Sequence, residues 1–253
     1  MSPHPAILTA STATPALTPV DSTVSHPIVY PSGDGEPVAE TFVHFYAIMT
    51  AIEVLKQYLT GQQATVLGNQ FLYYIQGNPR ARVAPDVMVI FNVEPGGRDN
   101  YKIWEEGAAP RVIFEMTSAS TRSVDEGFKK TLYAHLGVEE YWLFDPREEW
   151  QESSLRGYHL VGSDYQPLGE AVSQALGLRL EVQDQLIHFY RLDTGEKLLL
   201  PTELKESLTV AQTQLEEAQT QLEATQSQIE ATQQKNDELE ARLAQYQERF
   251  GSL

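Results

Sequence analysis

The chain has 253 residues and no cysteine, which excludes disulfides, zinc–thiolate sites and cysteine nucleophiles and is compatible with a reducing, cytoplasmic location. Its formal charge of −17 argues against general, tight binding to nucleic acid, because contacts to phosphates need lysine and arginine. No apolar run is long enough to span a membrane, and the N-terminus lacks the basic and apolar regions of a signal peptide, so we expect no membrane partner.

The N-terminal part of the chain predicts a disordered arm followed by a helix. Residues 1–30 are rich in Pro, Ser, Thr and Ala, carry almost no charge and show no periodicity. From Glu40 to Leu59, apolar residues recur at helical spacing, which predicts an amphipathic helix. The residues of this pattern are Phe45, Ile48, Ile52, Leu55 and Leu59.

Two short β-rich runs follow this helix, at residues 64–67 and 71–75. Gly68 and Asn69 lie between them. A glycine–asparagine pair between two strand-like runs is a turn signal, so the sequence predicts a β-hairpin here.

Two further strand-like runs each contain one carboxylate. Asp86 lies in residues 85–90, and Glu115 lies in residues 111–116. An acid in a run that should be buried on both faces is costly when it is unpaired. Two such acids on neighbouring strands could share one divalent cation, which would form a hard, oxygen-lined metal site. The spacing therefore indicates metal-assisted hydrolysis of a phosphodiester.

Each of these acids also has a structural interpretation. Asp86 could be a turn aspartate that caps a loop, and taken alone this is the stronger interpretation. Glu115 ends an apolar run and precedes polar residues, near a strand end where the sites of α/β sheets gather. Its structural alternative is pairing with a structural partner such as Arg111 or Arg82.

A helix is predicted after the second of these runs. Ser123 and Glu126 form a capping box at its start, and Gly137 is placed to end it. At about 100° per residue, a core-facing stripe is predicted at Phe128, Leu132, His135 and Leu136. Lys129 lies about 60° from the centre of this stripe and can reach the sheet, whereas Lys130 lies about 160° away, in solvent. The alternative for Lys129 is a lysine whose stem covers the edge of the core.

Further β-like segments complete the domain. Residues 138–145 predict a strand, and residues 156–200 alternate turns with short β-like pieces such as 158–161 and 186–190. We therefore expect an α/β domain over residues 31–200, with a mixed central sheet flanked by helices. A local basic cleft could use Arg80, Arg82, Arg111, Arg122 and Lys129.

Residues 201–253 predict a coiled coil, and they carry 4 Lys+Arg against 10 Asp+Glu. One heptad series is Leu208, Leu215, Leu222, Ile229, Asn236 and Leu243, and the other is Leu204, Ala211, Ala218, Thr225, Thr232, Leu239 and Tyr246. Asn236 resembles the buried polar residue that selects a parallel dimer, so we expect a homodimer joined through residues 204–250. A single long helix that leans on the domain is the alternative.

Several of these motifs together resemble one protein family. They are Gly35-Glu36, His44, Pro85-Asp86, the run from Glu115 to Thr121, Lys129 with Tyr133, and the run from Gly137 to Pro146. In this order and spacing they are similar to the Uma2 family of endonucleases, which has the restriction-endonuclease-like fold of the PD-(D/E)XK superfamily. The resemblance covers about residues 30–200 and leaves out both the arm and the coiled coil.

The resemblance implies a site and an activity. Asp86 and Glu115 would bind Mg²⁺ or Mn²⁺. Lys129 would replace the motif lysine that most of the superfamily carries on the Glu115 strand, where this chain has Thr117. The protein would then be a metal-dependent endonuclease, a phosphodiester hydrolase with DNA as its substrate, and the nuclease domain could add its own dimer surface.

Two other points follow from the resemblance. Glu40, one helical turn before His44, would be the extra helix acid of related folds, a weaker assignment than the three above. The family usually reads Glu-Val-Leu-Ser-Pro-Ser-Thr where this chain has Thr117 and Ala119. Neither change touches a metal ligand, but both could alter the loop after the strand.

The charge of −17 and the lack of an aromatic and basic nucleic-acid platform also support a second hypothesis. In this hypothesis the domain is catalytically silent and serves as an interaction module or scaffold, assembled through its coiled coil. Binding of a divalent ion that is lost in Asp86→Ala would favour the enzyme, and no binding would favour the scaffold.

Overall fold

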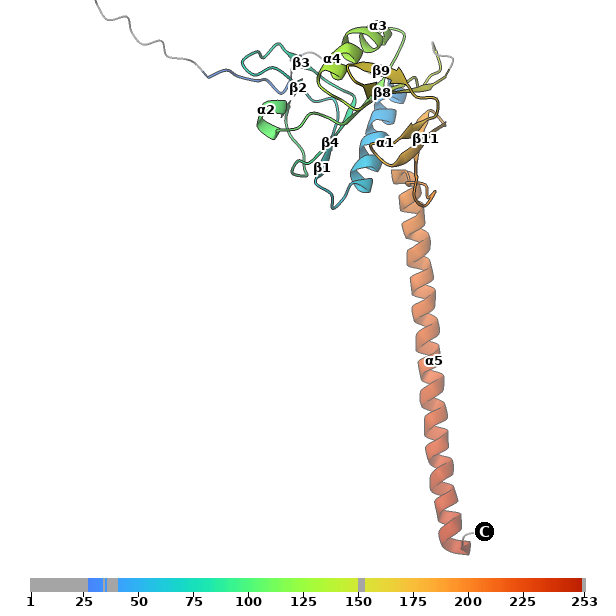
Figure 1. Cartoon of the computed structure of the whole chain (residues 1–253). Helices are drawn as coiled ribbons and strands as arrows, with labels where there is room; N and C mark the ends of the chain where they lie inside the picture. The colour runs from blue at the N-terminus through green and yellow to red at the C-terminus, as the bar shows by residue number, and fades with distance from the viewer. Residues whose placement is uncertain (1–26, 34, 36–40, 150–152, 252–253) are drawn as a thin grey trace, which may run out of the picture.

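The computed structural model describes residues 27–33, 35, 41–149 and 153–251. It shows an α/β domain and one long helix that extends away from it (Figure 1). Apart from residues 27–30, the predicted disordered arm lies outside the described residues. Within that short stretch, Tyr30 packs against Tyr73 with 5.1 Å between ring centroids and accepts a hydrogen bond from the amide of Gly77.

The helical segments are α1 (Phe42–Tyr58), α2 (Ile103–Glu106), α3 (Arg122–Val124), the π-helical turn η1 (Asp125–Lys129), α4 (Lys130–His135) and α5 (Pro201–Phe250). The strands are β1 (Ala64–Leu67), β2 (Leu72–Tyr73), β3 (Arg82–Val83), β4 (Val87–Phe91), β5 (Tyr101–Lys102), β6 (Val112–Met116), β7 (Glu140–Phe144), β8 (Leu155–Val161), β9 (Asp164–Pro167), β10 (Val172–Ser173), β11 (Leu178–Gln183) and β12 (Leu186–Arg191). Among these described segments, no helix is both long and apolar enough to cross a membrane.

The central sheet has six strands in the order β1-β4-β6-β7-β8-β9. Its neighbouring strands are antiparallel, except that β6 and β7 are parallel. A parallel pair needs a crossover connection, and the chain makes it through α3, η1 and α4. The predicted α/β class with a mixed central sheet is therefore confirmed.

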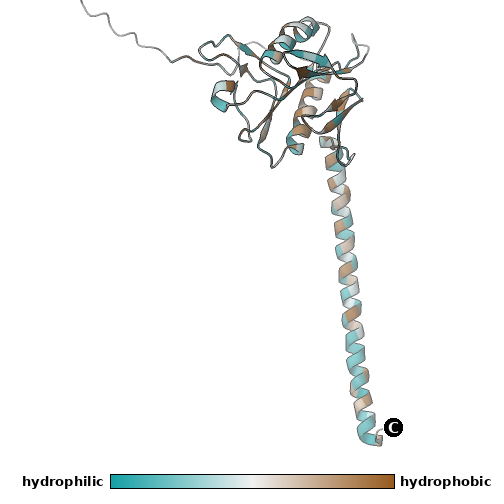
Figure 2. Cartoon of the chain, in the orientation of Figure 1, coloured by the Kyte–Doolittle hydropathy of each residue, from teal (hydrophilic) through white to brown (hydrophobic). Residues whose placement is uncertain are grey.

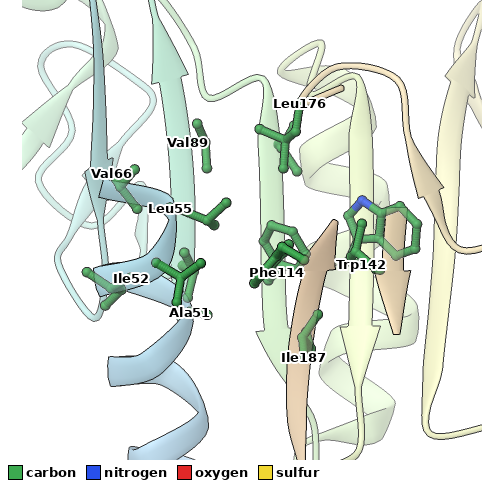
Figure 3. Close-up of a cluster of buried hydrophobic side chains, with 14 of the residues drawn as sticks. Ala51, Ile52, Leu55, Val66, Val89, Phe114, Trp142, Leu176 and Ile187 are labelled. Carbon is green, nitrogen blue, oxygen red and sulfur yellow. The ribbon is translucent and has the colours of Figure 1, made fainter. Parts of the chain in front are cut away.

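The two faces of the central sheet are covered differently. Successive side chains of a strand point to opposite faces. On one face, Phe114 of β6 packs with α1 and the small sheet β10-β11-β12 (Figure 3). On the other face, Ile113 packs with Tyr133 of α4 and Tyr141 of β7. Glu115 has the same parity as Ile113, so its side chain points toward α4.

Helix α1 begins where the side chain of Thr41 accepts a hydrogen bond from the amide of His44. The predicted amphipathic helix is confirmed, and its buried pattern residues are Ile48, Ile52, Leu55 and Leu59. Phe45 belongs to the same predicted pattern but is 53% exposed. The buried face therefore starts almost one turn later than the sequence predicted.

The predicted hairpin at Gly68 and Asn69 is wrong. β1 pairs with β4, whereas β2 pairs with β3 and β5 in a separate three-stranded sheet. A Cβ at Gly68 would lie 2.6 Å from the backbone oxygen of Asp86, so glycine permits a close approach there. Asn69 has a positive φ of 52°, and its amide donates to the carbonyl of Pro85. The two residues thus tie the end of β1 to the start of β4.

The helix after β6 begins earlier than predicted. α3 starts at Arg122, and residues 125–129 then form a π turn, in which hydrogen bonds span one more residue than in an α-helix. Ser123 therefore lies inside the helix, and the side chain of Glu126 pairs with Arg122, so the predicted capping box is wrong. Gly137, with a φ of 77°, follows the end of α4 as predicted.

The predicted core-facing stripe of this helix is confirmed at Leu132 and Leu136, which pack against the core, and wrong at Phe128 and His135, which are exposed. Phe128 is 57% exposed, whereas Asp125 and Tyr133 are buried, with Lys129 on the same face. The physical reason is Glu115 on β6, which is buried under this face. A buried carboxylate needs hydrogen-bond donors or cations around it, so the helix turns its polar side chains inward.

Helix α5 is exposed along its length, except for the partly buried Glu203 and Leu204 in its first turn. It starts at Pro201, and Glu203 accepts a hydrogen bond from the amide of Leu200 and pairs with Lys197. No described residue of α5 is buried, and hydrophobic residues lie along its surface (Figure 2). Figure 1 shows α5 pointing away from the domain, so a helix that leans on the domain is not observed. The coiled coil and the dimer stay predictions.

Candidate active site

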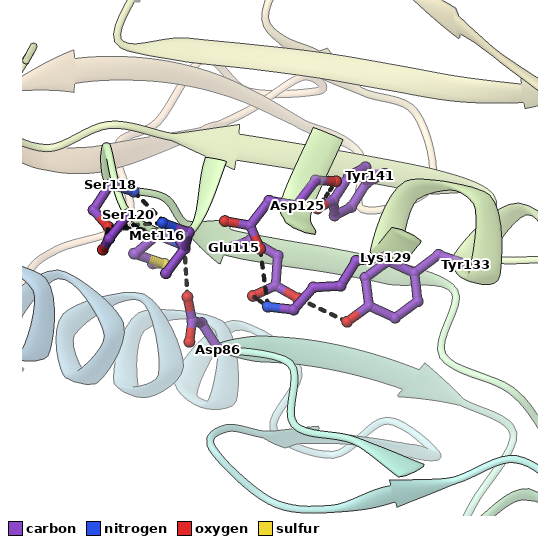
Figure 4. Close-up of polar contacts among 10 residues, drawn as sticks. Asp86, Glu115, Met116, Ser118, Ser120, Asp125, Lys129, Tyr133 and Tyr141 are labelled. Carbon is purple, nitrogen blue, oxygen red and sulfur yellow. Dashed lines mark hydrogen bonds and ion pairs between the residues drawn. The ribbon is translucent and has the colours of Figure 1, made fainter. Parts of the chain in front are cut away.

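Glu115 is the buried carboxylate at the centre of the candidate site (Figure 4). Its side chain is 1% exposed. Lys129 donates to Oε2 of Glu115 at 2.9 Å, and the hydroxyl of Tyr133 donates to Oε1 at 2.7 Å. Neither arginine named as a structural partner pairs with Glu115, because Arg82 lies over an aromatic ring and Arg111 pairs with a different glutamate.

These contacts shift the proton affinities of the three side chains. Burial raises the pKa of Glu115; the charge of Lys129 opposes this shift, and the charge of Asp125 adds to it. Burial alone would lower the pKa of Lys129, but the charges of Glu115 and Asp125 outweigh it and raise that pKa. Burial and the charge of Glu115 both raise the pKa of Tyr133. At neutral pH, Lys129 is therefore a cation and Tyr133 a neutral hydrogen-bond donor.

Asp125 is a second buried acid at this site, and the sequence did not single it out. Its Oδ1 lies 3.0 Å from Nζ of Lys129, and its side chain is 2% exposed. Its backbone carbonyl accepts a hydrogen bond from the hydroxyl of Tyr141. A signal was present, because Asp125, Lys129 and Tyr133 recur every four residues and so share one helix face. The assumption that apolar residues define the buried face hid this pattern.

The two lysines of the helix lie in different surroundings. Lys129 reaches β6, as the helix geometry predicts, and Lys130 does not. Lys130 is nevertheless only partly exposed, since its Nζ lies 3.5 Å from the centroid of the Tyr158 ring. Burial also lowers the pKa of Lys130. The prediction that Lys130 lies in solvent is therefore wrong.

Asp86 lies one residue before β4. The register between β4 and β6, continued by one residue, places Asp86 opposite Glu115. Residues that lie opposite each other in an antiparallel pair share a face of the sheet. The carboxylate of Asp86 accepts a hydrogen bond from the amide of Met116 at 2.7 Å (Figure 4). Asp86 is thus held against β6 and contributes to the charge felt by Lys129.

A cavity of about 420 Å³ opens beside these residues. Its lining includes Asp86, Asp125 and Lys129. Glu115 is buried behind this lining, in contact with Lys129. A ligand in the cavity would therefore meet the lysine before it meets Glu115.

Two further elements contribute to the cavity. His44 of α1 lines it, and Nε2 of His44 lies 3.3 Å from the carbonyl oxygen of Thr117, directly after β6. Arg147 and its ion-pair partner Glu149 also line it, although the sequence singled out neither. Glu40, the weaker candidate acid, lies outside the described residues.

The predicted basic cleft does not form among the residues that the structure describes. Arg82 lies over an aromatic ring, and Arg111 and Arg122 pair with nearby glutamates. Of the five residues predicted for the cleft, Lys129 alone lines the cavity. The physical reason is the excess of acid, which supplies the arginines with partners close by in the chain or sheet.

The side chains suit a hard divalent cation under one condition. Within residues 41–149 and the other described parts, no group of three or more His, Cys, Asp or Glu side chains is arranged to hold a metal ion. Mg²⁺, however, usually keeps several waters and is bound by only one or two carboxylates together with substrate phosphates. Asp86 and Glu115 supply the two carboxylates that such a site uses. The condition is that Lys129 moves away from Glu115, because it occupies one carboxylate oxygen.

Comparison with known proteins identifies the family. The sequence model of Uma2, described as "Putative restriction endonuclease", matches residues 28–225, which includes the whole domain and the first half of α5. No curated protein matches the chain. One matching solved structure is the "Crystal structure of a putative nuclease belonging to DUF820 from Anabaena variabilis ATCC 29413", with a TM-score of 0.43 and 16% identity, covering 59% of this chain and 82% of that chain. The mixed sheet has the restriction-endonuclease-like fold, and this chain belongs to the Uma2 family.

Proposed function

We propose that this protein is a divalent-metal-dependent endonuclease that hydrolyses phosphodiester bonds of DNA. Asp86 and Glu115 hold Mg²⁺ or Mn²⁺, and Lys129 acts on the reacting phosphate. The observation that carries this proposal is the buried contact between Glu115 and Lys129, beside a cavity that Asp86 lines. Membership of the Uma2 family supports the reaction class.

The charges of the side chains suggest how they divide the chemistry. A divalent ion at Asp86 and Glu115 would polarise the scissile phosphate and lower the pKa of a bound water. Lys129 is a cation at neutral pH, so it would donate to a phosphate oxygen or orient the attacking water, and so stabilise the charge that develops in the transition state. Tyr133 would keep Glu115 oriented through its hydroxyl.

Nicking of supercoiled plasmid DNA in the presence of Mg²⁺ or Mn²⁺ tests the proposal. We expect Glu115→Gln to abolish nicking, because the amide carries no charge to hold the ion. Glu140→Gln is a matched control, since Glu140 is also 1% exposed but accepts a hydrogen bond from the side chain of Trp142 on the same strand, β7, outside the cavity lining. Unchanged nicking by Glu115→Gln would contradict the assignment of Glu115 to the site. Nicking that persists in EDTA would contradict the proposed metal dependence.

We further propose that the chain divides into a nuclease domain over residues 31–200 and a coiled coil over residues 201–253 that joins two copies in parallel. The apolar positions of the main heptad series support this, because they are exposed in the single chain. They are Leu208, Leu215, Leu222, Ile229 and Leu243, all 55–66% exposed. Light scattering should show a dimer for the full chain and a monomer for a chain that ends at Pro201. An unchanged oligomeric state after truncation would mean that α5 does not assemble the protein.

The exposed helix also favours a second candidate function, a catalytically silent scaffold that works through α5. The net charge of −17 supports it, because the protein as a whole repels DNA. Calorimetric titration with Mg²⁺ separates the two functions. Binding that disappears in Asp86→Ala but persists in Asp164→Ala, a control at an exposed aspartate of β9, supports the enzyme. No binding at millimolar Mg²⁺ supports the scaffold.

A further inference from the structure

Lys129 is shared between two buried carboxylates. Its Nζ lies 2.9 Å from Oε2 of Glu115 and 3.0 Å from Oδ1 of Asp125. The second oxygen of Glu115 is occupied by the hydroxyl of Tyr133. Both oxygens of Glu115 are therefore engaged, and one of the two partners is a cation (Figure 4).

The lysine also lies on the side from which an ion would arrive. Lys129 and Asp125 line the cavity, whereas Glu115 is buried behind them. A divalent ion that binds Glu115 from the cavity would repel the ammonium group of Lys129, because both cations would lie beside one carboxylate, and this repulsion favours displacement of the lysine. Once displaced, the ammonium group needs another acceptor, since an unpaired charge in a buried site is costly.

Asp125 is already placed to be that acceptor. Its carboxylate is 2% exposed, it lies four residues before Lys129, and it contacts the same nitrogen. The π turn that contains both residues brings them to one face of the helix, and the hydroxyl of Tyr141 holds the backbone carbonyl of Asp125. Lys129 can therefore leave Glu115 and keep an anionic partner without leaving the site.

We propose that Asp125 is a positioning residue that holds Lys129 when a divalent ion takes Glu115. Asp125 then lowers the free-energy cost of metal binding, and it leaves the ammonium group beside the ion, where the reaction needs it. This inference rests on the proposed function. It differs from a role as a metal ligand, because Asp125 acts only through Lys129.

Calorimetric titration of Mn²⁺ into the full-length chain tests this in a double-mutant cycle. The four proteins are the wild type, Asp125→Asn, Lys129→Met and the double variant. We expect Asp125→Asn to weaken Mn²⁺ binding by about 10- to 100-fold, the range typical of residues that support a metal ligand. Lys129→Met should bind Mn²⁺ more tightly than the wild type. In that background, adding Asp125→Asn should cost less than about threefold, because the residue through which Asp125 acts is gone.

Each other outcome has a definite meaning. An equal loss of affinity with and without Lys129 would show that Asp125 binds the ion directly, which overturns the inference. An unchanged affinity in Asp125→Asn would show that Asp125 has no part in metal binding, which also overturns it. If the wild type itself binds no Mn²⁺, the proposed function fails, and the inference fails with it.

A measurement on the wild type covers the case in which a variant does not fold, as judged by circular dichroism. Carboxylate ¹³C signals of the full-length protein are followed while Mg²⁺ is added. We expect the signal of Glu115 to move strongly and that of Asp125 to move little, because Asp125 keeps its lysine. A shift of Asp125 as large as that of Glu115 would overturn the inference.

Discussion

The domain and helix α5 differ in whether residues that are costly without a partner find that partner within the chain. In the domain, buried polar groups such as Glu115 and Glu140 have donors within the same chain. In α5, no residue is buried, and large apolar side chains such as Leu222 and Phe250 are 66% and 71% exposed. The domain supplies partners for these buried carboxylates, whereas α5 has an apolar seam that needs another surface.

The difference also separates two kinds of local signal. The heptads of α5 are regular. In its middle, however, the hydroxyls of Thr225 and Thr232 donate hydrogen bonds to the backbone carbonyls four residues earlier, which destabilises a helix slightly. The domain has no such regular repeat, yet its site is held by contacts between β4, β6 and the helix that follows. A strong repeat therefore does not imply a self-sufficient structure, and an irregular segment can contain the most constrained residues.

Removal of the buried lysine should have the largest effect on the domain. We expect Lys129→Met to lower the free energy of unfolding by about 3–5 kcal/mol near pH 8, because it leaves Glu115 unpaired. Burial raises the pKa of Glu115 in the folded wild type, and loss of the Lys129 charge raises it further, so the cost grows as pH rises above the folded-state pKa of Glu115 and shrinks below it. Urea unfolding at two pH values measures this.

Lys130→Met is the matched control for that experiment. Lys130 lies over the ring of Tyr158, whereas Lys129 is the lysine that pairs with Glu115, so the removal of Lys130 should cost less than about 1 kcal/mol. Equal losses of unfolding free energy in the two variants would mean that the buried ion pair of Glu115 stabilises the domain no more than the contact of Lys130 with Tyr158 does.

Gly68→Ala should have the next largest effect. A Cβ at Gly68 would lie 2.6 Å from the backbone oxygen of Asp86 and 2.4 Å from the end of the Ile52 side chain, so the backbone at Asp86 must shift and Ile52 must move aside. We expect a loss of about 1–3 kcal/mol in unfolding free energy, together with weaker metal-dependent nicking. Gly169→Ala is the control, because nothing lies within 4 Å of a Cβ there. Nicking at the wild-type rate would show that the backbone position of Asp86 is not critical.

The buried His188 of β12 should make the domain less stable at acidic pH. Burial lowers the pKa of His188, and the charge of Lys197 lowers it further, while Glu203 and Asp184 oppose this. The folded state therefore prefers neutral histidine. Stability is complete above the unfolded pKa of about 6.5 and falls as pH decreases below it. Thermal melting between about pH 8 and pH 5 measures this.

The control for this pH dependence uses two glutamine variants. His188→Gln should flatten the fall in stability, and His159→Gln, at an exposed position, should leave it as in the wild type. A fall that is unchanged in His188→Gln would assign the pH dependence to other groups.

Substitutions in α5 should have the smallest effect on the domain and a large one on assembly. We expect Leu215→Ser with Leu222→Ser to change the unfolding free energy of the domain by less than about 0.5 kcal/mol, because both side chains are exposed there. The same variant should lower the mass measured by light scattering from dimer to monomer. Thr220→Ser, at an outer heptad position, should change neither. If the double serine variant destabilised the domain, α5 would be contributing to the stability of the domain, contrary to the difference described between the two regions.

Much of the site was predictable from local patterns. The acids Asp86 and Glu115 stand out because they interrupt or border β-rich runs, and Lys129 follows at a position that can reach the sheet. The structure brings Lys129 to Glu115 and places Asp86 opposite it across β4 and β6. Their roles in catalysis remain part of the proposal. Asp125 was missed although it shares a helix face with Lys129 and Tyr133, because the buried face was assigned from apolar residues and the carboxylate beneath this face was not considered.

The sequence by itself determined the family, the α/β class, the helical nature of α5 and the positions of the two strand acids. These follow from short-range patterns such as alternation, heptads and motif spacing. Only the tertiary structure decided that β1 pairs with β4 instead of β2, and that the helix after β6 buries Asp125 and Tyr133 instead of Phe128. Both choices depend on what lies opposite in space. A strand pairs with the partner that completes its sheet, and a helix turns toward a buried carboxylate the side chains that can satisfy it.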